Sequence, residues 1–93
     1  RAWQRKREKI RQRDFHLCRL ALYYENRIVC DDLSVHHIEP LAEVWESRLE
    51  DGNLITLSRA WHEEAEAGNV PRELLHTLAG IPPAIDFEKL RRG

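Results

Sequence analysis

The run Leu54-Ile55-Thr56-Leu57 limits the possible folds more than any other part of the sequence. Its β-branched and apolar residues favour a strand, and the Asp51-Gly52 pair before it is typical of a turn. Ser58 follows the run directly and is a favourable N-cap for a helix, which we expect to reach about Ala67 before Gly68-Asn69 ends it. A turn, a strand and a helix are therefore expected in immediate succession.

Segments on either side supply further elements around this strand. Residues 27–30 and 33–38 are short and β-branched, and Asp31-Asp32 between them favours a turn, so both segments are predicted to be strands. Apolar spacing predicts further helices over residues 2–13, over the segment 41–49 that follows Pro40, and over residues 71–80. The expected fold class is α+β, with two strands and a helix at its centre over residues 28–67.

The length of 93 residues corresponds to one small domain with a thin core, because such a chain hides only about 60 to 65% of its unfolded surface. We expect residues 1–13 to form a basic N-terminal helix, residues 71–80 a C-terminal helix and residues 84–93 a loosely held tail. No apolar stretch approaches the roughly 18 residues of a membrane span, and no signal-peptide pattern is present. Two cysteines do not make a disulfide framework, so the expected compartment is the cytoplasm.

Positive charge is concentrated at the N-terminus. Residues 1–13 contain seven Lys or Arg and one acidic residue, a charge of +6, so the rest of the chain carries −7 within the net charge of −1. A basic arm on an acidic body favours contact with a polyanion, and the phosphate backbone of DNA is the commonest one. The expected contacts come from Arg5, Lys6, Lys9 and Arg13. Alternatively, the arm is a solvated helical face whose arginines pair with the body's own acids.

Three segments carry residue types that suit metal-dependent chemistry. The strand segment Val35-His36-His37-Ile38-Glu39-Pro40 contains two adjacent histidines, Asn53 precedes the clearest strand, and His62 lies in the helix after it. An adjacent histidine pair is only weakly informative by itself, because five histidines are spread over this short chain. The order of the three segments makes the combination much more specific.

This order resembles that of the HNH endonucleases, whose strand–loop–strand–helix unit is the ββα-metal finger. His37, Asn53 and His62 fill the positions of the family's His, Asn and His. The segment 41–49 is similar to the loop helix of phage-type members, and residues 13–18 are similar to the segment that precedes their finger. The resemblance covers roughly residues 3–67.

The resemblance implies a role for each residue. His36 and His62 would bind one divalent metal ion, with Glu66 as a possible but less favoured ligand. His37 would be the general base that takes a proton from the attacking water, which suits imidazole because its unperturbed pKa of about 6.5 leaves it mostly neutral at pH 7. Asn53 would position the loop. The expected ion is Mg²⁺ or Mn²⁺, although histidine ligands also suit Ni²⁺ or Zn²⁺.

Each of these assignments has a structural alternative. His62 would, in isolation, more often be a surface residue than a ligand, and Asn53 also suits a turn. Strict alternation along a strand would send His36 and His37 to opposite faces of the sheet. Two further histidines fit no motif and are expected to be structural or surface residues, His16 and His76.

The sequence departs from the family at the structural zinc site. Many relatives carry two Cys-x-x-Cys pairs, which here read Cys18-Arg19-Leu20-Ala21 and Ser58-Arg59-Ala60-Trp61. A closed structural site needs four zinc donors, so we expect no structural zinc. Cys30 is expected to be a small buried residue. In place of the zinc site, apolar contacts of Trp61 with Leu17, Leu20 and Ala21 are expected to fill the space.

The sequence therefore favours a metal-dependent HNH endonuclease that hydrolyses phosphodiester bonds of DNA, nicking or cutting it with low sequence specificity. Such a protein would be cytoplasmic and of bacterial or phage origin, with DNA as its partner, no membrane contact and no small-molecule cofactor. The main alternative is a DNA-binding module that keeps the finger without catalysis. A small structural-metal domain with a protein partner is a third interpretation, which the missing cysteines disfavour.

Overall fold

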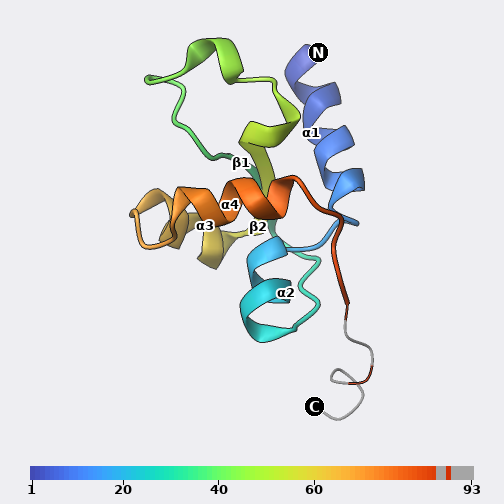
Figure 1. The fold of residues 1–93 in the computed structure, drawn as a ribbon. Helices are drawn as coiled ribbons and strands as arrows, with labels where there is room; N and C mark the ends of the chain where they lie inside the picture. The colour runs from blue at the N-terminus through green and yellow to red at the C-terminus, as the bar shows by residue number, and fades with distance from the viewer. Residues whose placement is uncertain (86–87, 89–93) are drawn as a thin grey trace.

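A two-stranded antiparallel sheet lies at the centre of the fold (Figure 1). In this computed structural model, which describes residues 1–85 and Glu88, strand β1 (Leu33–His37) pairs with strand β2 (Leu54–Ser58). The register places Leu33 opposite Ser58 and His37 opposite Leu54. The strands predicted at residues 33–38 and 54–57 are therefore confirmed.

Within the described residues, four α-helices accompany the sheet, which confirms the α+β class. They are α1 (Ala2–Arg13), α2 (Arg19–Glu25), α3 (Arg59–Glu66) and α4 (Arg72–Ala79). Ser58 caps α3 as predicted, because its Oγ accepts a hydrogen bond from the backbone N–H of Trp61 at 3.5 Å. None of these helices is long and apolar enough to cross a lipid bilayer. Most of the predicted tail over residues 84–93 lies outside the described residues.

The strand predicted over residues 27–30 is wrong. This segment pairs with neither strand, and the Val29 carbonyl instead accepts the Cys18 backbone N–H at 2.9 Å, at the start of α2. Asn26 and Asp32 flank the segment with positive φ angles of 49° and 53°, so the chain turns at both of its ends. Cys30 is exposed rather than buried, because it lies in this unpaired segment.

The helix predicted over residues 41–49 is also wrong. The segment forms turns and one short 3₁₀ helix, η1 (Trp45–Ser47), and a second, η2 (Asp51–Asn53), follows it. Val44 interrupts the helical path with φ −138° and ψ 69°. The apolar positions that suggested one buried helical face include Leu41 and Trp45, which are 41% and 57% exposed. A helix here would have had no core to cover.

The core is divided between the two faces of the sheet. Ile55 and Leu57 of β2 belong to the larger cluster, which also includes buried residues of α2 and α4 such as Leu20, Ala21, Leu75 and Leu78. Leu54 and Val35 belong to a smaller cluster with Ile10 of α1 and the half-buried Trp3. Alternation along the strands thus places α1 on one face and α2 with α4 on the other.

A fully buried carboxylate joins three elements at the end of α1. Asp14 accepts a hydrogen bond from the Thr56 backbone N–H at 3.0 Å and forms ion pairs with Arg13 at 3.0 Å and Arg19 at 2.9 Å. These contacts satisfy both carboxylate oxygens, so the charge is tolerated without water. Asp14 therefore fixes α1, α2 and β2 relative to one another.

Candidate metal centre

His36 and His62 meet on the face of the sheet that α3 covers. His36 lies in β1 and is 6% exposed, and His62 lies in α3, with 4.9 Å between the ring centroids. Glu66 lies one helical turn after His62, and its Oε1 is 3.2 Å from His62 Nε2. One potential ligand atom from each of the three side chains lies within 4.8 Å of the others. The structure thus brings Glu66 beside the two predicted ligands.

Ser34 orients one of these rings, and sequence reasoning missed it. Its hydroxyl bonds His62 Nδ1 at 2.8 Å, which engages that nitrogen and leaves Nε2 directed to Glu66 and the cavity. Ser34 lies two residues before His36, so alternation puts both side chains on one face of β1. The two-residue spacing of Ser34 and His36 is the sequence signal that could have drawn attention to Ser34. A hydrogen bond to the second ring nitrogen is the usual way in which a protein fixes a metal-binding histidine.

The pKa of His36 is lowered to about 4, first by burial and then by the neighbouring His62. The ring is therefore neutral at pH 7 and has a lone pair available for an ion. Two imidazoles and one carboxylate can hold a divalent cation and leave positions for water or phosphate oxygen. Because two of the three donors are nitrogen, the set fits Mn²⁺, Ni²⁺ or Zn²⁺ better than Mg²⁺, which prefers oxygen.

His37 points to the opposite face of the sheet, as strand alternation requires. Its ring stacks on Trp3 of α1, with 4.9 Å between centroids and 23° between planes. Its Nε2 lies 3.1 Å from the backbone oxygen of Arg48, which can only accept, so the bond places the ring proton on Nε2. Nδ1 is then the nitrogen that can take a proton. His37 nevertheless lines the same cavity, of about 560 Å³, as His36, His62 and Glu66.

Asn53 ties together the two ends of the chain between the strands. Its Oδ1 accepts the Glu39 backbone N–H at 2.7 Å, and its Nδ2 donates to the backbone oxygens of Glu39 at 3.4 Å and Ser47 at 3.3 Å. The side chain is buried, so these bonds replace water. The same loop carries Arg48, whose carbonyl holds His37. Asn53 thereby supports the position of His37 through the loop.

Helix α4 is attached to the same loop by a charged network. His76 contacts Glu39 Oε2 at 2.8 Å and the Gly52 backbone oxygen at 2.9 Å. Arg72 bonds Glu39 at 2.9 Å and Glu43 at 3.2 Å. The pKa of Glu39 is lowered, chiefly by its hydrogen bond with His76, and Glu43 raises the pKa of Arg72. His76 thus has a structural role, which is one of the two roles expected from the sequence.

The four basic residues of α1 that were expected to contact DNA fall into two groups. Arg5 and Lys9 are exposed, and their side chains make no hydrogen bond or ion pair in the part of the chain that the structure describes. Lys6 pairs with Asp51 at 2.6 Å, and Arg13 is held by Asp14 and by the backbone oxygens of Asp51 and Leu54. Of these four, and within the described residues, Arg5 and Lys9 leave their charges open to a polyanion, while Lys6 and Arg13 pair with the body.

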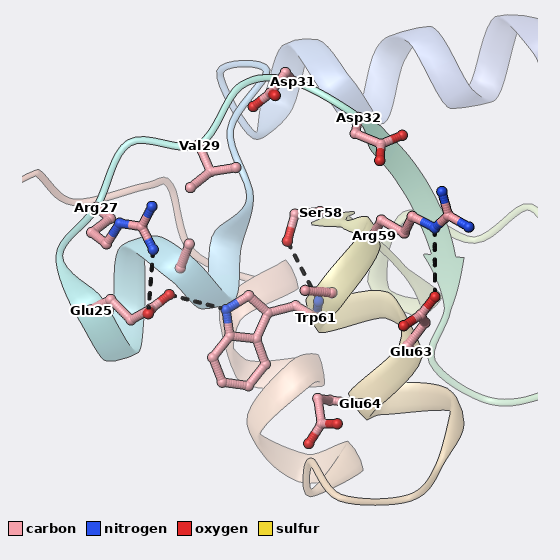
Figure 2. Close-up of a pocket in the computed structure, with 12 residues that line it drawn as sticks. Glu25, Arg27, Val29, Asp31, Asp32, Ser58, Arg59, Trp61, Glu63 and Glu64 are labelled. Atoms are coloured by element: carbon pink, nitrogen blue, oxygen red, sulfur yellow. Dashed lines mark hydrogen bonds and ion pairs between the residues drawn. The ribbon is translucent and has the colours of Figure 1, made fainter.

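Trp61 lies where relatives of the resembled family carry a zinc ligand. Figure 2 shows its indole beside Glu25, to which Nε1 donates at 3.3 Å, and the ring also stacks on Tyr24 at 5.3 Å between centroids. It packs against the larger core cluster, which contains Leu20 and Ala21 as expected but does not include Leu17. The adjacent cavity of about 640 Å³ is bordered by acidic side chains, two of which pair with Arg27 and Arg59.

Comparisons of this chain with known protein families, with curated proteins and with solved structures found no match.

Proposed function

We propose that this chain is a metal-dependent nuclease of the HNH type that hydrolyses phosphodiester bonds in DNA. The observation that carries the proposal is the convergence of His36, His62 and Glu66 within 4.8 Å, in a cavity that His37 also lines. Residues of β1 and α3 that could hold an ion therefore line the same cavity as the candidate base, which supports the proposal. The resemblance of the sequence to the HNH finger supports the same assignment.

Each residue has a chemical task in this proposal. A divalent ion, when bound, supplies positive charge that neutralises the phosphate and stabilises the leaving oxygen. His36, His62 and Glu66 hold that ion, and Ser34 fixes the ring of His62. His37 takes the proton of the attacking water at Nδ1, while Arg48 keeps the other ring nitrogen engaged.

The choice of DNA rests on charge. Arg5 and Lys9 are exposed on α1 without side-chain partners in the described residues, so their charges are available to phosphates. A non-catalytic DNA-binding module is the second candidate function. The stacking of His37 on Trp3 favours it, because that contact gives His37 a packing role that needs no catalysis.

A plasmid-cleavage assay tests the proposal. Supercoiled plasmid is incubated with the protein and Mg²⁺, Mn²⁺, Ni²⁺ or Zn²⁺ in turn, with a chelator and the His37→Ala variant as controls. We expect cleavage with at least Mn²⁺, none with the chelator, and a loss of about 100- to 10,000-fold in the variant. Binding of DNA without cleavage by any of the four ions would instead favour the non-catalytic module.

A further inference from the structure

His37 also lines another cavity, of about 390 Å³. It is formed by the N-terminal end of α1 and the segment between the strands, which lie at the same end of the molecule in Figure 1. Trp3, His37 and Trp45 line it with flat rings, and Arg48 and Leu41 complete the wall. The apolar residues that suggested a helix over residues 41–49 therefore line a cavity instead.

Flat groups in this cavity are already arranged for stacking. Trp3 and His37 lie nearly parallel, at 23° between planes, and the Arg48 guanidinium lies 4.1 Å from the centre of the Trp45 ring. Trp45 nevertheless remains 57% exposed, and Leu41 is 41% exposed. A large aromatic side chain left open beside other rings offers a surface on which a flat partner can stack.

The charged side chain that lines the cavity suits an anionic ligand. Among the described residues that line the cavity, Arg48 is basic and none is acidic, whereas Glu46 and Glu50 are exposed on the segment around it. The exposed Arg5 lies on the same helix as Trp3. The cavity beside Trp61 is the opposite case, because acidic side chains border it (Figure 2). Aromatic rings combined with arginine are the usual platform for the bases of single-stranded nucleic acid.

We propose that this aromatic cavity binds an unpaired nucleobase, which makes single-stranded or locally unpaired DNA the substrate class. The inference rests on the proposed nuclease function for its placement: His37 lines both cavities, so a strand held at His36 and His62 passes His37 to reach Trp45. A base inside a duplex has both faces covered by its neighbours, so only an unstacked base can enter.

Binding without cleavage tests the inference. A fluorescently labelled oligonucleotide is titrated with protein in the presence of a chelator, as a single strand and as a duplex of the same sequence, at one salt concentration. Trp45→Ala is expected to weaken binding of the single strand by about 5- to 150-fold and to leave duplex binding unchanged. Trp45→Phe should restore most of the affinity. Tyr23→Ala removes a similarly exposed aromatic residue from α2 and should change neither affinity.

The outcomes separate this inference from the nuclease proposal. If Trp45→Ala leaves single-strand binding unchanged, or weakens both forms of DNA equally, the inference is wrong even if the protein cleaves plasmid. If binding of single strands depends on Trp45 but no metal supports cleavage, the base-binding cavity stands and the nuclease proposal fails. Circular dichroism of each variant confirms that the exposed substitutions leave the fold intact.

Discussion

The ring of His36 meets the ring of His62 edge-on, with 4.9 Å between their centroids and 69° between their planes. This contact joins β1 to α3 on the face of the sheet that also carries the larger core cluster. The contact disfavours protonation of both rings together, because two imidazolium ions at this distance would repel each other. Protons and a divalent cation therefore compete for the same pair of side chains.

The first prediction concerns the pH dependence of stability in the metal-free protein. The pKa of His36 is lowered to about 4 in the folded chain, chiefly by burial, from 6.5 for an ordinary imidazole. The unfolded chain therefore takes up a proton on His36 more readily than the folded chain does. The stability that neutral His36 contributes is fully present above pH 6.5 and is lost as the pH falls towards 4. We expect this residue to lower the free energy of unfolding by about 3 kcal/mol over that range.

Urea denaturation at several pH values measures this effect, and the His36→Gln variant provides the reference. Because groups other than His36 also contribute to the pH dependence of stability, the informative quantity is the difference in slope between the two proteins. The variant should show a clearly flatter dependence. Equal slopes would mean that His36 is not held neutral by burial.

The second prediction separates ligands from base. His62→Ala should lose metal binding and cleavage together, because the ring belongs to the cluster that would hold the ion. His37→Ala should lose cleavage by about 100- to 10,000-fold and keep its metal affinity, since its ring faces Trp3. Calorimetric titration with Mn²⁺ reports affinity in both variants. A His37→Ala protein that no longer binds metal would reverse the two assignments.

The elements around the site were largely predictable because their signals are local. Ser58 as a cap, Gly68 as a helix end and the apolar run of β2 each act within a few residues. The segments 27–30 and 41–49 failed because strand pairing and core contact depend on distant residues. The residues of the site show the same division between local signals and contacts with distant residues.

The order of His36, His37, Asn53 and His62 was visible in the sequence, whereas their partners were not. Ser34 holds His62 across 28 positions of the chain, and Asp14 accepts the Thr56 N–H across 42 positions. Alternation places Ser34 on the same face of β1 as His36, but nothing local shows that Ser34 contacts His62 or that Asp14 contacts Thr56. Tertiary hydrogen bonds of this kind become visible only when the strands and helices are placed.

The third prediction revises the expected role of the basic arm. Reversal of Arg5 and Lys9 to glutamate should weaken DNA binding on all sequences and reduce the log–log salt slope by about 0.9 for each lost phosphate contact. Arg13 is left unchanged because it holds Asp14. The same reversal at the exposed Arg27 is the control. An unaltered slope in the arm variant would show that α1 does not contact phosphate.

The fourth prediction concerns Asp14. Asp14→Asn keeps the size of the side chain but leaves Arg19, only 2% exposed, without its paired charge. We expect a loss of about 3 to 5 kcal/mol in the free energy of unfolding, measured by urea denaturation. Asp32→Asn changes an exposed aspartate and should have little effect. Similar losses in the two variants would show that the buried network contributes no more than surface charge.

The last prediction concerns how much Trp61 contributes to stability and whether the fold depends on a metal. Its indole is half-buried, stacks on Tyr24 and bonds Glu25, so it contributes less than a fully buried ring. Trp61→Ala should lower the free energy of unfolding by about 1 to 3 kcal/mol, rather than the 3 to 5 kcal/mol that complete burial would give. The exposed Trp45 provides the matched control, since Trp45→Ala removes the same ring from a loop.

The fold itself should not require a metal. Cys18 is buried and its Sγ accepts the Ala21 backbone N–H at 3.4 Å, so the thiol acts as the N-cap of α2. We therefore expect chelator-treated protein to stay folded and to melt cooperatively, while cleavage is lost on chelation. Elemental analysis of the purified protein accompanies the melts. Tightly bound zinc together with a collapse of the melt on chelation would show that Cys18 is a ligand, because only a structural metal contributes so much to folding in a domain of this size.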